Sequence, residues 1–198
     1  EVFMKIINDL EELYPIDEVK VFSGSLGNFR KLITTKYKAQ RIHTPKPPLL
    51  NEMHKWVKEN YDSIYGHGIE TDDIVARYWF ELSNEIGRDN VMIVSIDKDY
   101  KQFPCLMYNY HAKHKCVYDI TKEEAMYNFY EQMIVGDSAD NVNYCKGYGK
   151  KYAEKYLAGC KTQYKYTKKT YNLFKEIHKG KAKQRYIECY NLLKLRTK

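Results

Sequence analysis

Apolar and polar positions follow two different spacings along the chain. Where apolar residues recur every three or four positions, we expect amphipathic helices. These helices are predicted at residues 3–13, 49–65, 71–86 and 122–134, followed by a helix-like stretch over 161–198 that Gly180 interrupts. Residues 18–22 are predicted to form a short buried strand, and the nearly all-apolar run 91–96 is typical of a central parallel strand. A further pair of short strands is expected within 105–118.

Turn-forming and capping residues separate these segments. The Ser-Gly-Ser triplet at 23–25 predicts a turn after the first strand. Three prolines within 44–48 exclude a helix interior and predict a loop. Thr121 and Glu124 have the spacing of a capping box that begins a helix. The resulting order of helices and strands predicts an α/β fold with a mostly parallel sheet flanked by helices.

Length and composition fit one or two globular domains. The 198 residues are 43% hydrophobic and 30% charged, which is enough apolar content for a hydrophobic core. No uncharged apolar run approaches the roughly 18 residues of a membrane span, so an integral membrane protein is excluded at this stage. The five cysteines form no C-x-x-C pair, so neither a disulfide framework nor a zinc ribbon is expected, and a reducing cytosol is the predicted compartment.

The charge is distributed unevenly. Residues 142–198 contain 16 lysines and arginines against three acids, a net charge of +13, while residues 1–141 carry −6. A segment this basic predicts binding to a polyanion, and interleaved tyrosines favour nucleic acid because aromatic rings can stack on bases. A solvated lysine-rich face, with the tyrosines in the core of helices, is the alternative.

Acidic residues occur in three compact groups. They are Glu70, Asp72 and Asp73; Asp97 and Asp99; and Asp137 and Asp140. The second group follows the predicted strand 91–96, where open α/β sheets usually bind ligands. If the groups converge, seven carboxylates cannot all stay ionised without cations, and Mg²⁺ or Mn²⁺ suits such oxygen ligands. Two ions about 3.5–4 Å apart could bind the attacking and leaving oxygens of a phosphodiester.

Each acidic group also has a structural explanation. Asp72 and Asp73 could be ordinary acids at a helix N-terminus, Asp97 and Asp99 could belong to a loop, and the third group could form an N-cap or Asx turn. Their joint appearance before a basic segment favours the functional interpretation. The G-Y-G-K-K run at 147–151 adds a candidate phosphate contact, because small residues and helix-start amides let the backbone approach a phosphate.

Four motifs in order carry a family resemblance. They are G-I-E-T-D-D-I-V-A (68–76), V-S-I-D-K-D-Y-K-Q-F (94–103), I-V-G-D-S-A-D-N-V (134–142) and K-G-Y-G-K-K-Y-A (146–153), preceded by V-F-S-G (21–24) and a basic segment at 29–41. Together they resemble the 5′-to-3′ exonuclease and flap endonuclease family over roughly residues 18–160. The resemblance implies a PIN-like α/β nuclease core at 1–135. It also implies a helical DNA-binding region at 136–198, with a helix–three-turn–helix hairpin.

The resemblance also implies an activity and a role for each matched residue. The activity is metal-dependent, structure-specific 5′ nuclease action on branched or 5′-ended duplex DNA, and on the RNA of RNA–DNA hybrids, in replication or repair. Glu70, Asp72 and Asp73 would serve one Mg²⁺ or Mn²⁺ ion, and Asp97, Asp99, Asp137 and Asp140 a second. Lys38 and Arg41 would act near the scissile phosphate. The implied DNA contacts are Arg30, Gly147, Gly149, Lys150 and Lys151, with a K⁺ ion at the hairpin.

Two departures from the family pattern leave alternatives open. The family has an aspartate after its second strand, where this chain has Ser23, and another on a first strand that would precede Glu1. Residues 42–66 are also short for the family's helical arch. A catalytically impaired, structure-selective DNA-binding relative is therefore the alternative to the nuclease. A PIN-like ribonuclease acting on single-stranded RNA is a third interpretation.

Overall fold

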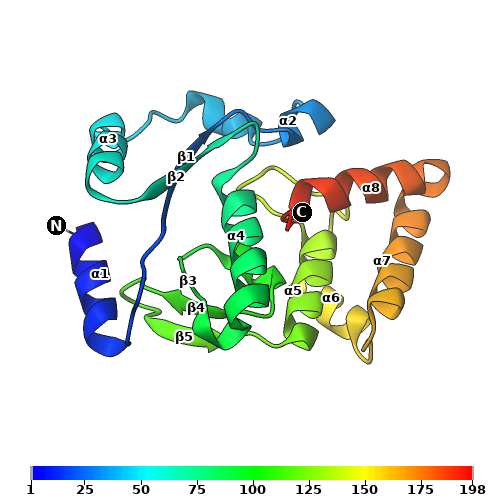
Figure 1. Cartoon of the computed structure of the whole chain (residues 1–198). Helices are drawn as coiled ribbons and strands as arrows, with labels where there is room; N and C mark the ends of the chain where they lie inside the picture. Colours follow the sequence, from blue (N-terminus) through cyan, green and yellow to red (C-terminus); the bar gives the residue numbers. More distant parts are fainter. Residues whose placement is uncertain (1, 198) are drawn as a thin grey trace.

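Helices and strands alternate through the first part of the chain, and only helices follow. The computed structural model describes residues 2–197 (Figure 1). Its α-helices are α1 (Val2–Leu13), α2 (Arg30–Ile33), α3 (Leu50–Asn60), α4 (Thr71–Ile86), α5 (Lys122–Val135), α6 (Lys150–Leu157), α7 (Gln163–His178) and α8 (Ala182–Leu193). Its strands are β1 (Val21–Leu26), β2 (Ser63–His67), β3 (Met92–Val94), β4 (Leu106–Asn109) and β5 (Cys116–Asp119). Short 3₁₀ turns include η1 (Ala39–His43), η3 (Lys98–Gln102) and η4 (Lys179–Lys181).

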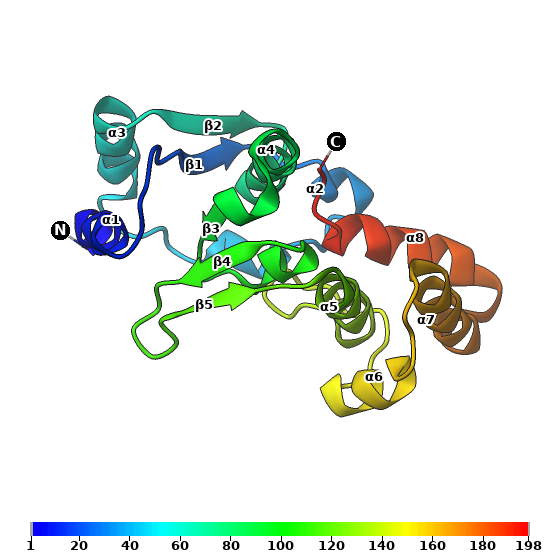
Figure 2. The ribbon, with the colours of Figure 1, turned by 60° about the horizontal axis from the view of Figure 1, so that its bottom comes forward.

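The strands form two small sheets with mainly parallel pairing. β1 and β2 are parallel, with Val21 beside Ser63. β3 and β4 are also parallel, whereas β4 and β5 are antiparallel, with Leu106 opposite Asp119. Figure 2 shows the two sheets on different sides of α4. The predicted α/β class with parallel sheets is confirmed. Among the described residues, no strand precedes β1, and α1 takes the first place instead.

The sequence pattern predicted most helices and strands, but it missed the full length of β1 and the whole of β2. α4 has the predicted bounds, and Thr121 forms the predicted capping box with Glu124 at the start of α5. The Ser-Gly-Ser triplet was wrongly assigned to a turn, because β1 continues through it with a shift of register and Gly24 at φ +64°. β2 was missed because Gly66 lies within it. Pairing with β1 overrides the low strand preference of glycine.

Two clusters of buried apolar residues stabilise the fold, and α5 contributes to both. One cluster lies between α4, β3 and β4, where Trp79 stacks on Phe103 with ring centroids 5.4 Å apart. The other fills the space between α5, α6, α7 and α8. Ala125 of α5 belongs to the first cluster, and Phe129, one turn later, belongs to the second. The predicted domain boundary after residue 135 falls at the end of α5, a helix that contributes to both clusters. The division into two domains stays a prediction.

Most tyrosines of the basic region pack against the second cluster. Tyr166 is buried, and six others are partly buried against the cluster: Tyr144, Tyr148, Tyr152, Tyr156, Tyr186 and Tyr190. Tyr164, by contrast, is 71% exposed. The structural alternative for these rings therefore accounts for most of them, so the tyrosines are not a general stacking surface for bases. None of the helices within residues 2–197 is long and apolar enough to cross a membrane.

Gly136 is the position where the turn after α5 depends on glycine. Its φ is +79°, and a Cβ atom there would lie 2.2 Å from the carbonyl oxygen of Val142. That carbonyl accepts a hydrogen bond from the backbone N–H of Asp137 at 2.7 Å. The backbone contact that closes the turn thus leaves no room for a side chain.

We predict that Gly136→Ala lowers the free energy of unfolding by more than about 2 kcal/mol, because it combines a positive φ with a backbone clash. Urea denaturation followed by circular dichroism measures the change. Gly180→Ala is the matched control, since a Cβ atom at Gly180 meets nothing within 4 Å. Equal stability of the two variants would contradict this account of the turn.

Candidate active site

Six of the seven predicted acids line one pocket. They are Glu70, Asp72, Asp97, Asp99, Asp137 and Asp140. The pocket holds about 350 Å³, and its acids come from three segments: the start of α4, the residues after β3, and the turn after α5. The sequence places these groups up to 70 residues apart, so their convergence is a property of the fold.

Local backbone structure fixes several of these carboxylates. Asp97 caps η3, accepting a hydrogen bond from the backbone N–H of Asp99 at 2.9 Å. Asp137 Oδ1 accepts from the backbone N–H groups of Ala139 at 2.8 Å and Asp140 at 3.2 Å. The Asx-turn explanation for Asp137 is thus correct, whereas Asp97 and Asp99 belong to a short 3₁₀ helix and its cap instead of a loop. These local hydrogen bonds are compatible with a shared site, because all three carboxylates still line the pocket.

Three cationic side chains reach into the same pocket. Lys38 Nζ pairs with Glu70 Oε1 and lies 3.5 Å from Asp140 Oδ1. Arg41 pairs with the same Asp140 oxygen at 3.0 Å. Lys98, between two of the predicted acids, pairs with Asp137 Oδ2 at 2.8 Å. Six acids against three cations leave an excess of three negative charges when all groups are ionised.

Burial, with this excess of negative charge, shifts the pKa values of two partly buried carboxyls upward. Burial, together with the charges of Asp97 and Glu70, raises the pKa of Asp72 to about 6. Burial and the charges of Asp97 and Asp137 raise the pKa of Asp99 to about 7. Burial also works to raise the pKa of Asp137, but hydrogen bonds from Lys98 and the two backbone N–H groups outweigh it and lower that pKa. The pocket therefore favours added positive charge.

Two further side chains in this network were not predicted. The hydroxyl of the buried Tyr37 lies 2.8 Å from Glu70 Oε2 and 2.7 Å from Asp140 Oδ2, so it can donate its proton to either. Gln132 of α5 donates to Asp99 Oδ1 at 2.8 Å. Tyr37 precedes Lys38 in the basic segment, which is the only sequence signal for it. Gln132 lies in an ordinary helical pattern and gives none.

Arg30 and Asp73 require a correction. The Arg30 side chain is 1% exposed, and Asp73 is fully buried against it in a two-pronged ion pair with N–O distances of 2.6 and 2.9 Å. Arg30 also donates to Glu70 at 2.9 Å and to the carbonyl oxygens of Leu192 and Lys194, each at 2.9 Å. All five N–H donors are thus used inside the protein. Arg30 cannot contact DNA from this position, and Asp73 does not line the pocket.

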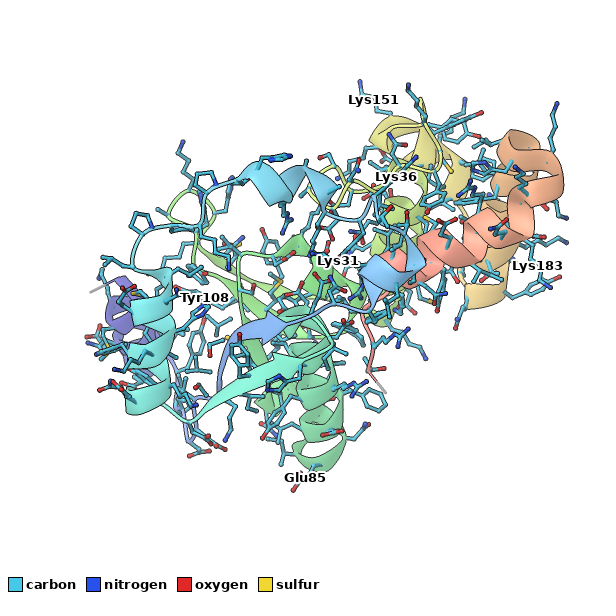
Figure 3. All side chains as sticks on the ribbon, turned by 90° about the horizontal axis from the view of Figure 1, so that it is seen from above. Lys31, Lys36, Glu85, Tyr108, Lys151 and Lys183 are labelled. Atoms are coloured by element: carbon cyan, nitrogen blue, oxygen red, sulfur yellow. The ribbon has the colours of Figure 1, made fainter. Side chains whose placement is uncertain are left out.

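The predicted phosphate-binding hairpin lies outside the pocket. Gly147 has φ +93°, and Gly149 is the N-cap of α6. Lys150 and Lys151 follow in the first turn of α6, and both side chains are exposed. Figure 3 shows Lys151 at the periphery of the molecule. Ser23, which stands where the family pattern has an aspartate, lies within β1 and does not line the pocket.

The donor set of the pocket fits hard divalent cations. Every acid that lines it offers carboxylate oxygen, the ligand type that Mg²⁺ and Mn²⁺ prefer. Within residues 2–197, no three His, Cys, Asp or Glu side chains already form a compact cation cage. Lys38 and Lys98 lie between the acids and pair with Glu70 and Asp137, so a cation would have to share these carboxylate oxygens with them.

Comparison with known proteins finds solved structures with a similar fold. No protein-family model and no curated protein matches the sequence. Solved structures do match: a bacteriophage T5 protein co-crystallised with metal ions has a TM-score of 0.65 and 13% identity, over 98% of this chain and 92% of that chain. The bacteriophage T5 5′-exonuclease with bound zinc gives 0.63 and 14%, over 98% and 90%. A pseudo-enzyme-product complex of the bacteriophage T5 flap endonuclease with DNA and metal ions gives 0.62 and 14%, over 97% and 90%.

These matches extend over nearly the whole length of both chains. At 13–14% identity, they establish a common fold. The fold implied by the four sequence motifs is therefore confirmed, and this chain has the fold of the bacteriophage T5 5′-exonuclease.

We predict that Arg30→Met lowers the free energy of unfolding by about 3–5 kcal/mol, because it leaves the buried Asp73 carboxylate without its partner. Urea denaturation is the measurement. Arg41→Met is the control: its side chain is 52% exposed, so its loss is expected to change stability by no more than about 1 kcal/mol. If Arg30→Met were as stable as Arg41→Met, the structural role of Arg30 would be wrong.

Proposed function

We propose that this protein is a divalent-metal-dependent, structure-specific 5′ nuclease that hydrolyses phosphodiester bonds of DNA. The observation that carries the proposal is the convergence of six carboxylates from three distant segments in one pocket with unbalanced negative charge. The fold relatives support it, since their structures contain metal ions and, in one case, DNA. DNA with a 5′ end or a flap is the proposed substrate, and the RNA of an RNA–DNA hybrid is a second one.

The acids of the pocket come from different segments of the chain. Glu70 and Asp72 lie at the start of α4, and Asp97, Asp99, Asp137 and Asp140 come from the loops after β3 and α5. We assign the first pair to one Mg²⁺ or Mn²⁺ ion and the other four to a second. The bound ions would supply a hydroxide at neutral pH and stabilise the leaving oxygen.

Lys38 and Arg41 are the proposed contacts to the reacting phosphate. Both side chains line the pocket, next to Asp140. When cations neutralise the acids, the ion pairs of Lys38 and Arg41 with them weaken, and their N–H groups become free for phosphate oxygens. Their charge would then stabilise the negative charge that develops on the phosphate in the transition state.

The exposed start of α6 is the proposed contact surface for duplex DNA. Gly147 and Gly149 lack side chains that would separate the backbone from a phosphate, and Lys150 and Lys151 supply positive charge at the same place. Contacts of this kind go to the sugar–phosphate backbone and carry no sequence information. Specificity would therefore depend on the shape of the DNA.

We predict that Asp97→Asn lowers cleavage of a labelled 5′-flap duplex by more than about 100-fold and leaves binding of that duplex intact or tighter, because it removes a cation ligand and a charge that repels phosphate. Cleavage is measured with Mn²⁺ and again with EDTA, which is expected to stop it. Asp119→Asn is the control, since Asp119 pairs with Arg88 outside the pocket. Binding by the wild-type protein without metal-dependent cleavage would instead favour a catalytically impaired DNA-binding protein.

We predict that replacing both Lys150 and Lys151 with alanine weakens duplex binding equally on different sequences and reduces the slope of log affinity against log salt by about 1.8. Fluorescence anisotropy over a range of KCl concentrations gives both quantities. The control replaces two exposed lysines outside this region, Lys113 and Lys122. A loss that depends on the DNA sequence would show that α6 contacts bases instead of the backbone.

A further inference from the structure

Gln132 joins two acids that come from different loops. It lies in the last turn of α5, and its Nε2 is 2.8 Å from Asp99 Oδ1 and 3.4 Å from Asp137 Oδ2. An amide carries no charge, so Gln132 does not compete with a cation as Lys98 does. It is placed to hold both carboxylates, with Asp99 Oδ2 left for a ligand, while Asp137 Oδ1 already accepts the backbone N–H groups of Ala139 and Asp140.

A second glutamine, Gln102, fixes the orientation of Gln132. Gln102 is buried, and its Oε1 accepts from the backbone N–H of Leu195 at 3.3 Å. Its Nε2 donates to the carbonyl oxygen of Leu193 at 2.8 Å and to Gln132 Oε1 at 3.1 Å. A backbone N–H can only donate and a backbone carbonyl can only accept. The chain after α8 therefore sets which way both amides point, and Nε2 of Gln132 must face the carboxylates.

We propose that Gln132 is a positioning residue for the metal-binding carboxylates Asp99 and Asp137, held in place through Gln102 by the segment Leu193–Leu195. The inference rests on the nuclease proposed above. Hydrogen-bond partners of metal ligands typically set cation affinity by about 10–100-fold. Without the amide, two neighbouring carboxylates lose their common donor, and their mutual repulsion lets them move apart before a cation binds.

The variant that tests this is Gln132→Met, which keeps the length of the side chain and removes its N–H donors. Mn²⁺ binding is followed by isothermal titration calorimetry, without DNA. We expect the affinity of one class of sites to fall about 10-fold. Gln102→Met should lower the Mn²⁺ affinity of the same class of sites by a smaller factor. In that variant, Gln132 keeps its own N–H donors but loses the hydrogen bond from Gln102 that orients it. Gln184→Met, at an exposed position of α8, is the matched control and should bind Mn²⁺ like the wild type.

Four outcomes are informative, and Mn²⁺ affinity is read only on protein shown to be folded by circular dichroism. Weaker Mn²⁺ binding by Gln132→Met, with cleavage restored at high Mn²⁺, supports the positioning role, since a general structural defect would not be rescued by metal. Wild-type affinity in folded Gln132→Met overturns it. If that variant does not fold, Gln102→Met decides alone, and wild-type affinity there overturns the proposal. Absence of Mn²⁺ binding by the wild-type protein would contradict the nuclease proposal itself, which separates the two failures.

Discussion

The structure depends on one buried cation. Arg30 lies between the start of α4, where it pairs with Glu70 and Asp73, and the end of α8, where it donates to the carbonyl oxygens of Leu192 and Lys194. The positive charge is favourable at both ends, because it offsets acids at one helix N-terminus and meets the carbonyl groups at another helix C-terminus. Burying an ion pair is costly unless every donor is satisfied, and here all five are. Arg30 thereby ties the last helix of the basic region to the helix that begins the acidic pocket.

The same C-terminal segment is attached to the other side of the pocket through neutral groups. Leu195 is buried in the cluster beside α4, and its backbone N–H donates to Gln102. Arg196 contributes a backbone N–H to Asp73 at 2.9 Å. The chain end after α8 therefore contacts both networks, the charged one through Arg30 and the amide one through Gln102 and Gln132. Two sets of hydrogen bonds therefore connect the end of the proposed DNA-binding region to the proposed metal site.

Local spacing predicted the elements that carry the acids, and it could not predict which acids share the pocket. Asp72 and Asp73 are adjacent, so they point about 100° apart on α4, one toward the pocket and the other toward Arg30. Whether Asp72 or Asp73 faces the pocket depends on where β3 and α8 lie relative to α4. The residues next to Asp72 in the sequence do not determine that placement. For the same reason, Arg30 resembled the exposed basic residues around it in the sequence. Its burial follows from α8, which lies more than 150 residues later.

The structural and catalytic explanations of the acids are compatible because a carboxylate has two oxygens. Asp137 uses Oδ1 to accept the backbone N–H groups of its own turn, while Oδ2 faces Lys98 and Gln132. Asp97 likewise uses Oδ1 to cap η3. Capping holds the side chain in one rotamer, which lowers the conformational entropy lost when the second oxygen binds a cation. A loop that orders itself with aspartates can therefore present rigid ligands, and Gln132 adds a neutral donor that links Asp137 to Asp99.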